Sequence, residues 1–238
     1  MPQYSDDLWL GTATGPQSQG WNGPGQVFLG VGPLGRTYIY DIVPATLSAT
    51  AVCAAQAVAA AGYATINGAS ASGGVATMDC CRIVSVVSSG AGDTTQTVTI
   101  TGTDYWGQAQ TTRLNLNGTT TVNSLKGFKT ITSVYVSATL AGNLSVGNGD
   151  VFGLPYAVTD AGYLFRTGWA GAVADNAGTF VAADGTTASA TTGDVRGTFA
   201  PTGSASNGSR RLVIGIAMTG SQAGPNATQT AAIGVTPA

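Results

Sequence analysis

The stretch from Thr97 to Tyr156 carries most of the information about fold class, and it has the sequence TVTITGTDYWGQAQTTRLNLNGTTTVNSLKGFKTITSVYVSATLAGNLSVGNGDVFGLPY. Its first segment, TVTITGT, alternates apolar residues with threonines, which is the two-residue period of a strand buried on one face. The segment RLNLN continues this alternation, and ITSVYV is rich in the β-branched and aromatic residues that strands favour. Three strands are therefore expected between Thr97 and Val136.

Two turn signals separate these expected strands. The segment Asp104-Tyr105-Trp106-Gly107 has Asp first and Gly fourth, as in a type I turn. The dipeptide Asn117-Gly118 is a strong short-range signal for a turn between two strands. The stretch therefore predicts an antiparallel meander whose Thr and Asn side chains face water or a partner. The four glycines of Gly142–Gly153 predict an irregular loop, which Pro155 closes.

The composition of the whole chain also favours strands. Only 8% of its residues are charged, compared with about 25% in an ordinary soluble domain, and it contains no Glu and no His. Helix surfaces are usually covered by Glu, Lys and Arg, whereas the lysines of this chain are Lys126 and Lys129 alone. Thr, Ser, Gly, Ala and Val dominate instead. We therefore predict an all-β protein, an antiparallel β-sandwich or jelly roll.

Further strands are expected on both sides of the central stretch. Arg36–Val43 is a strand by composition, and Pro44 ends it or marks an edge strand. Val75–Ser88 contains an apolar run without clean alternation, which indicates a central strand covered on both faces. Ala45–Asn67 is ambiguous, because its alanines favour a helix, whereas its lack of charge and weak alternation favour strands, which we prefer. Four short strands are expected near the C-terminus: Tyr163–Arg166, Gly178–Val181, Asp194–Phe199 and Arg211–Met218.

The expected domain organisation follows from these elements. Residues 1–36 form a Gly- and Pro-rich N-terminal arm, and residues 37–220 form the β-sandwich or jelly-roll domain. This domain could consist of two subdomains, 37–156 and 157–220. Residues 221–238 form a polar C-terminal tail.

The residue types argue against most catalytic sites. Without His the chain has no Ser-His-Asp triad, no Cys-His pair and no imidazole metal ligand. Its eleven aspartates could supply the two carboxyl groups of a glycosidase, but apart from Asp6-Asp7 they are scattered singly, and several lie beside glycine, as turn-capping residues do. We therefore expect no enzyme, no cofactor and no metal site. The catalytic alternative is a polysaccharide-cleaving enzyme that uses a pair of aspartates.

Charge and cysteine content limit the partners and the compartment. The net charge is −2 and there is no basic block, so we expect no nucleic-acid binding. No run of about 18 apolar residues occurs, so we expect no membrane span. The start, MPQYSDDLWLG, lacks the basic and apolar runs of a secretion signal. Cys53, Cys80 and Cys81 are odd in number and form no C-x-x-C pair, which indicates buried or half-buried thiols in a protein made in a reducing cytosol.

Several phrases of the sequence have the pattern of a known family. They are TITGTDYWGQAQTTRLNLNG and KGFKTITSVYVS in the central stretch, Ala54–Gly90 upstream and Gly178–Met218 downstream. The chain resembles structural head proteins of tailed bacteriophages, in particular capsid decoration or cement proteins, which repeat a TGTD-x-x-G turn and a K-x-F-K-x-I/V-T-S-V-x-V strand. The resemblance covers the chain from Ala54 to Met218 and supplies no active site. The chain departs from the pattern at Trp106, where a smaller or polar residue is expected.

This resemblance implies a virion structural protein that binds the outside of a phage capsid and stabilises contacts between major capsid subunits. Its expected place is the capsid surface, after synthesis in the host bacterial cytoplasm. Its expected partners are the major capsid protein and further copies of itself, as a homo-oligomer and specifically a trimer. The alternative is a glycan- or host-surface-binding module of a phage head or tail, with Trp106 or Trp169 as the exposed ring. Either tryptophan could instead cover a core.

The N-terminal arm carries large apolar side chains despite its glycines and prolines. Burying one Leu or Phe stabilises a fold by roughly 1.5–3 kcal/mol, and disordered tails are normally poor in such residues. We therefore interpret it as an extended arm that packs on its own domain, on a sister subunit or on the capsid; the alternative is a covered N-terminal loop. The expected interface residues are Leu8, Trp9, Trp21, Phe28 and Trp106.

Deleting residues 1–25 should weaken attachment to the capsid or lower the melting temperature, because the deletion removes apolar side chains that the arm would bury. Cosedimentation with capsids measures the first effect and thermal unfolding measures the second. Undiminished attachment together with unchanged melting would remove the hypothesis of a packed arm.

Overall fold

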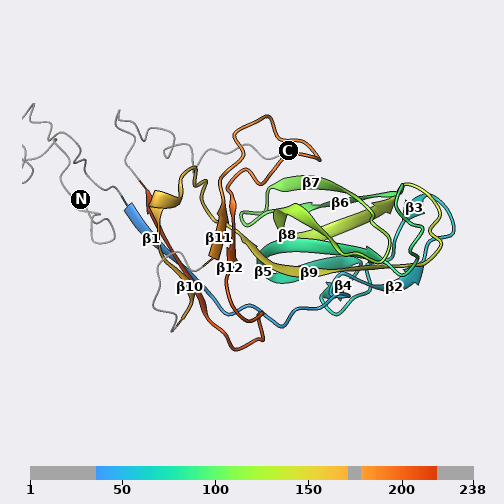
Figure 1. Ribbon diagram of the computed structural model, residues 1–238, viewed down its shortest axis with the longest axis horizontal. Helices are drawn as coiled ribbons and strands as arrows, with labels where there is room; N and C mark the ends of the chain where they lie inside the picture. The colour runs from blue at the N-terminus through green and yellow to red at the C-terminus, as the bar shows by residue number, and fades with distance from the viewer. Residues whose placement is uncertain (1–35, 171–177, 219–238) are drawn as a thin grey trace, which may run out of the picture.

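The computed structural model describes residues 36–170 and 178–218, and it shows an antiparallel, all-β protein (Figure 1). The predicted fold class is therefore confirmed. The N-terminal arm with Leu8, Trp9, Trp21 and Phe28, and the C-terminal tail, lie outside the described residues. The strands are β1 (Arg36–Ile42), β2 (Cys53–Ala57), β3 (Gly62–Tyr63), β4 (Ala71–Ser72), β5 (Val75–Ser88), β6 (Thr97–Thr103), β7 (Ala109–Asn115), β8 (Val122–Val136), β9 (Asn143–Gly153), β10 (Leu164–Trp169), β11 (Gly178–Val181), β12 (Thr198–Pro201) and β13 (Leu212–Met218), with a 3-10 turn, η1 (Ala161–Tyr163), before β10.

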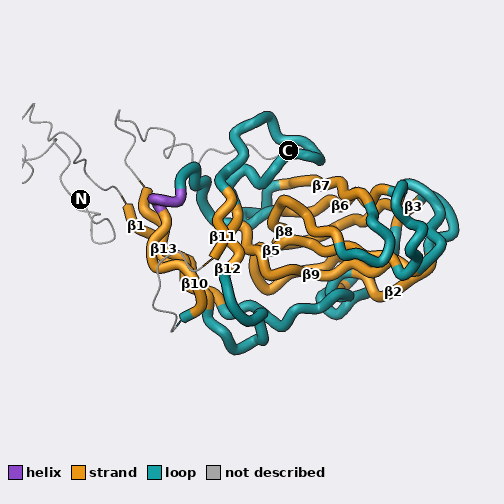
Figure 2. The backbone as a smooth tube through the Cα atoms, in the orientation of Figure 1, coloured by secondary structure: helices purple, strands orange, loops and turns teal. Residues whose placement is uncertain are grey.

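The described strands form two antiparallel sheets (Figure 2). The small sheet has the order β1-β13-β10, and the large sheet has the order β11-β12-β9-β5-β8-β6-β7, with β2, β3 and β4 paired to β9, β8 and β5. The large sheet is curled, as seen from the Gln110 side chain of β7, which donates to the Gly127 carbonyl of β8 although β6 lies between these strands. The small sheet and β3 lie toward opposite ends of the long axis (Figure 1).

The three central strands form, although β7 and β8 begin earlier than predicted, and their order differs from the predicted meander. Both predicted turns are present: Gly107 donates its N–H to the Asp104 carbonyl at 3.2 Å, and Thr120 donates to the Asn117 carbonyl at 3.0 Å. However, β6 pairs with both β7 and β8, so that Ile100 lies opposite Thr112 on one side and Val134 on the other. The meander is therefore wrong. The alternation of a strand specifies which face is buried but leaves open which neighbour it pairs with.

The predicted irregular loop over Gly142–Gly153 is wrong, because this segment forms β9. The strand pairs with β5 and, in addition, with β2 and β12. Its glycines lie where another segment comes too close for a side chain: a Cβ at Gly147 would be 2.2 Å from the Ser48 carbonyl oxygen, and one at Gly149 would be 2.7 Å from Cγ1 of Ile83. In β9 the glycines permit close packing of a central strand. In a sequence pattern, by contrast, several glycines usually indicate that a strand or helix is interrupted.

The other expected strands are confirmed with small shifts of their ends. The ambiguous Ala-rich segment contains the strands β2 and β3 and no helix, as preferred. β5 lies between β8 and β9 and is buried from Cys80 to Val86, as expected for a central strand. The clearest shift is in β12, which begins at Thr198, whereas the sequence suggested Asp194.

Two apolar cores lie within these sheets. One fills the curl of the large sheet and includes Val84, Ile100 and Val134, while the other lies beside the small sheet and includes Phe152, Phe199 and Ile214. β1 pairs with β13 along its whole length, so the first and last described strands are neighbours. The division into subdomains 37–156 and 157–220 stays a prediction.

Replacing Gly147 by alanine should lower the free energy of unfolding by about 1–3 kcal/mol, because the added methyl group would overlap the Ser48 carbonyl. Urea unfolding measures this change. Gly92→Ala is the matched control, since a Cβ at Gly92 has no atom within 4 Å, and it should change stability by less than about 0.5 kcal/mol. Equal stability of the two variants would contradict the close-packing explanation of β9.

Candidate interaction site

A connected group of five aromatic rings lies where the small sheet meets the large one. Tyr40 of β1 packs edge-on against Tyr105 with ring centroids 5.6 Å apart, and Tyr105 lies 4.9 Å from Trp106 at the tip of the β6–β7 turn. Trp106 lies 6.0 Å from Tyr156, which in turn lies 4.5 Å from Tyr38 of β1. Aromatic pairs at these separations are mutually stabilising. We refer to these five residues as the aromatic cluster.

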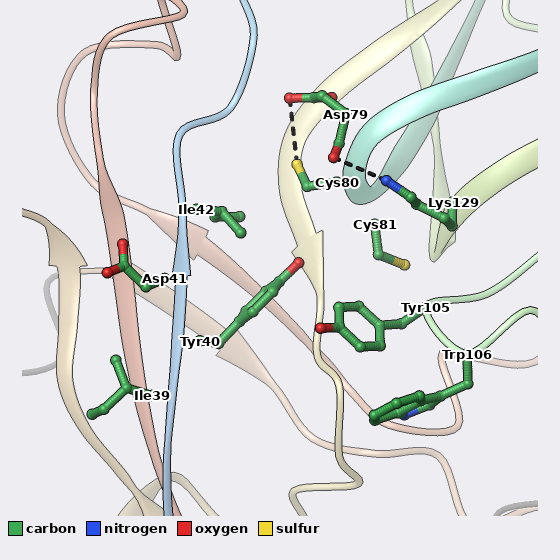
Figure 3. Close-up of a pocket in the computed structure, with 10 residues that line it drawn as sticks. All are labelled: Ile39, Tyr40, Asp41, Ile42, Asp79, Cys80, Cys81, Tyr105, Trp106 and Lys129. Atoms are coloured by element: carbon green, nitrogen blue, oxygen red, sulfur yellow. Dashed lines mark hydrogen bonds between the residues drawn. The ribbon is translucent and has the colours of Figure 1, made fainter.

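A groove of about 490 Å³ opens beside the aromatic cluster (Figure 3). In the close-up, the rings of Tyr40 and Tyr105 point toward one another, with Trp106 next to them. Lys129 lies on the opposite wall, where its ammonium group donates to the carbonyl oxygens of Met78 and Asp79 at 2.8 and 2.9 Å. The lining residues are Ile39, Tyr40, Asp41, Ile42, Asp79, Cys80, Cys81, Tyr105, Trp106 and Lys129.

Trp106 is exposed, yet it is held in place on two sides. Its side chain is 54% exposed, while its indole N–H donates to the Pro155 carbonyl at 2.6 Å. Its backbone N–H donates to Oδ1 of Asp104 at 2.8 Å, within the type I turn. A large ring that is already positioned loses little conformational entropy on binding, which makes it suited to anchor a partner.

The Asp104 carboxylate that holds the Trp106 turn belongs to a buried ion pair. Its Oδ2 atom accepts a hydrogen bond from the guanidinium of Arg196, and its Oδ1 atom also accepts the N–H of Gln108 at 2.9 Å. Arg196 donates a further hydrogen bond to Oε1 of Gln108 at 2.7 Å. A salt bridge therefore connects the tip of the β6–β7 turn to the segment before β12. Charge pairs at such depth are sensitive to the loss of either partner.

The remaining buried charges stabilise the fold, and none of them lines the groove. Lys126 donates to the carbonyls of Thr111 and Ser189 at 3.0 and 2.6 Å, and burial lowers its pKa. Burial also raises the pKa of the Asp194 carboxyl, although the N–H groups of Gly127 and Arg196 donate to it. These groups join loops to strands, which is a structural role.

The cysteines are free and buried, as predicted. Burial raises the pKa of Cys53 and of Cys80 to about 12, and it also raises the pKa of Cys81. All three thiols are therefore protonated at neutral pH, and a protonated thiol is a weak nucleophile and a weak metal ligand. Within residues 36–170 and 178–218, no group of three or more His, Cys, Asp or Glu side chains is arranged to hold a metal ion. In the same part of the chain, no helix is long and apolar enough to cross a membrane.

Of the five predicted interface residues, Trp106 is the one that the structure describes, and it is exposed at a hairpin tip as predicted. Leu8, Trp9, Trp21 and Phe28 lie outside the described residues. Trp169 is half-buried, its ring packs edge-on against Phe152 at 6.3 Å, and its indole nitrogen is buried, so it covers a core.

Sequence reasoning missed the tyrosines of the aromatic cluster. Tyr40 lies in β1 and Tyr105 in the turn between β6 and β7, so they are far apart in the chain and no periodicity links them. The sequence placed Tyr40 in an expected strand and Tyr105 in an expected turn, and neither position by itself indicates a binding site. Only the packing of the two sheets brings them together.

Comparison of the chain with models of protein families, with curated protein sequences and with solved structures finds no match. The resemblance to phage head proteins therefore stays a prediction. The site itself offers an anchored indole, neighbouring phenol rings and a groove. Such a surface is suited to binding.

Replacing Asp104 by alanine should lower the free energy of unfolding by about 3–5 kcal/mol, because it leaves the buried Arg196 charge without a carboxylate. Urea unfolding measures this change. The double variant Asp104→Ala/Arg196→Met should recover part of the lost stability. Additive losses in the double variant would contradict the coupling of these two residues.

Proposed function

We propose that this protein is a virion structural protein that binds the outside of a phage capsid and stabilises contacts between major capsid subunits. The observation that carries this proposal is the exposed, anchored ring of Trp106 beside a groove between two sheets. The cores of protein interfaces are enriched in aromatic residues, and Tyr40, Tyr105 and Trp106 give the groove this character.

The few charges at the groove already have partners within the protein. Asp41 accepts a hydrogen bond from Nε of Arg211 at 2.7 Å, in a two-point ion pair. Asp79 accepts the Ala45 N–H at 2.6 Å, and Lys129 donates to backbone carbonyls. A partner would therefore be held by apolar contacts and neutral hydrogen bonds. Such contacts depend little on ionic strength.

The surface composition supports a subunit that becomes covered by neighbours. Exposed apolar residues occur in and directly after β1, which lines the groove, among them Ile39, which is 58% exposed, and Val43. The low net charge gives little electrostatic repulsion between copies, which favours self-association. On this proposal, the protein assembles as a trimer on the capsid surface with the major capsid protein as its partner.

Replacing Trp106 by alanine should weaken attachment to purified capsids about thirtyfold, which corresponds to about 2 kcal/mol for a central interface residue. For the unchanged protein, attachment should persist in about 1 M NaCl, where the screening length falls to about 3 Å. Cosedimentation with capsids at low and high salt measures both effects.

Tyr63→Ala is the control for this experiment, since Tyr63 is exposed near the opposite end of the molecule. It should leave attachment unchanged. Detachment of the unchanged protein in high salt, or equal attachment of the Trp106→Ala variant, would argue against a capsid interface at the groove.

A further inference from the structure

A second exposed aromatic surface lies away from the groove. Tyr63 of β3 and Tyr135 of β8 are directly opposite in register, and their rings pack edge-to-face with centroids 5.3 Å apart. Tyr63 is 76% exposed and Tyr135 is 38% exposed. Figure 1 shows β3 toward the end of the long axis that is opposite the small sheet. Two large rings left in water on a well-packed sheet indicate a binding surface.

These two rings begin a row of side chains that crosses the sheet. Tyr135 lies opposite Thr99 of β6, and Thr99 lies opposite Arg113 of β7. Directly opposed residues point to the same face, and the neighbouring positions Val98 and Val134 are buried on the other face. The row Tyr63-Tyr135-Thr99-Arg113 therefore lies on the outer face. It crosses three strand spacings, or about 14 Å.

The rows on either side of these four residues present hydroxyl and amide groups. On one side, Thr101 lies opposite Ser133 and Thr111. On the other side, Thr97 lies opposite Asn115. Each of these groups can both donate and accept hydrogen bonds. The face therefore combines two rings with a regular set of neutral polar groups.

Arg113 is the cation of this face. It is exposed, and among the described residues no carboxylate forms a salt bridge with it, whereas Arg82, Arg196 and Arg211 each have an aspartate partner. A guanidinium group binds a carboxylate through two parallel hydrogen bonds. Arg113 is thus available to an acidic group of a ligand.

We propose that this face binds an acidic oligosaccharide, in which pyranose rings stack on Tyr63 and Tyr135 and a sugar carboxylate binds Arg113. The C–H faces of a pyranose are apolar and match the faces of the tyrosine rings. The sugar hydroxyls match the Thr, Ser and Asn side chains of the adjacent rows. The row is long enough for the rings and the guanidinium to bind different sugar units.

The polar rows favour a glycan over a second protein as the ligand. The core of a protein interface excludes water with apolar side chains, but around these rings the rows across β6, β7 and β8 carry hydroxyl and amide groups. A ligand must match those groups one by one, and an oligosaccharide carries a hydroxyl on most of its carbons. This inference goes beyond the proposed capsid attachment, since it concerns the other end of the molecule.

A glycan array that contains neutral dextran oligosaccharides together with alginate oligosaccharides and sialylated glycans tests this proposal. The full-length protein should bind acidic members in preference to dextran, although both the protein and these glycans carry net negative charge. Tyr63→Ala and Tyr135→Ala should each weaken binding about tenfold or more. Arg113→Gln should abolish the preference for acidic members.

Matched variants separate the roles of ring, charge and fold. Tyr63→Phe keeps the ring and should retain binding, and Trp106→Ala alters the other end of the molecule and should leave glycan binding unchanged. Failure to bind any acidic glycan, or unchanged binding by Tyr63→Ala, would overturn the proposal. Loss of self-association or capsid attachment in Tyr63→Ala, without glycan binding by the unchanged protein, would show a protein interface instead.

Discussion

The buried guanidinium of Arg82 is the interaction on which the junction of the two cores depends. Arg82 lies in β5, the strand that contributes Val84 to the core of the large sheet and Cys80 to the core beside the small sheet. Its guanidinium donates to Asp150 at 2.6 Å, to Ser206 at 3.0 Å and to two backbone carbonyls, and it lies over the ring of Phe152. A buried charge with this many partners holds them all in one arrangement, because leaving any of them unpaired is costly.

In this molecule, buried charged residues hold segments of the fold together, whereas exposed aromatic rings form the candidate binding surfaces. The chain has few charged residues, and several of them are used internally, with Arg196 supporting the Trp106 turn and Lys126 joining β8 to β7 and to the loop that contains Ser189. The outer surface carries mostly neutral side chains, a few exposed rings and some exposed charges such as Arg113 and Arg211. The groove at one end has a preformed indole, whereas the face at the other end has Tyr63 and Tyr135 among hydroxyl groups. The two surfaces therefore suit different partners.

Sequence patterns predicted most strands, because alternation and β-branched residues depend on local chemistry. β6 and both turns occur where expected, and β1 and β11 match closely, whereas β7 and β8 contain the predicted segments but begin earlier. The patterns failed at β9, where glycines 147 and 149 permit close contact with Ser48 and Ile83, neither of which is near in the sequence. At the candidate site, the exposure of Trp106 was predicted from its turn. Its contact with Pro155 and the ring of Tyr40 nearby depend on packing between distant segments.

By itself, the sequence determined that this is an all-β protein, that its cysteines are buried or half-buried and that Trp106 lies in a turn between two strands. Each of these properties follows from composition or from a period of a few residues. Only the tertiary structure decided the order of the strands, the partners of Arg82 and Arg196 and the alignment of Tyr63, Tyr135 and Arg113 on one face. The physical reason is that strand pairing and buried ion pairs join residues far apart in the chain, and their energies depend on geometry that no local pattern contains.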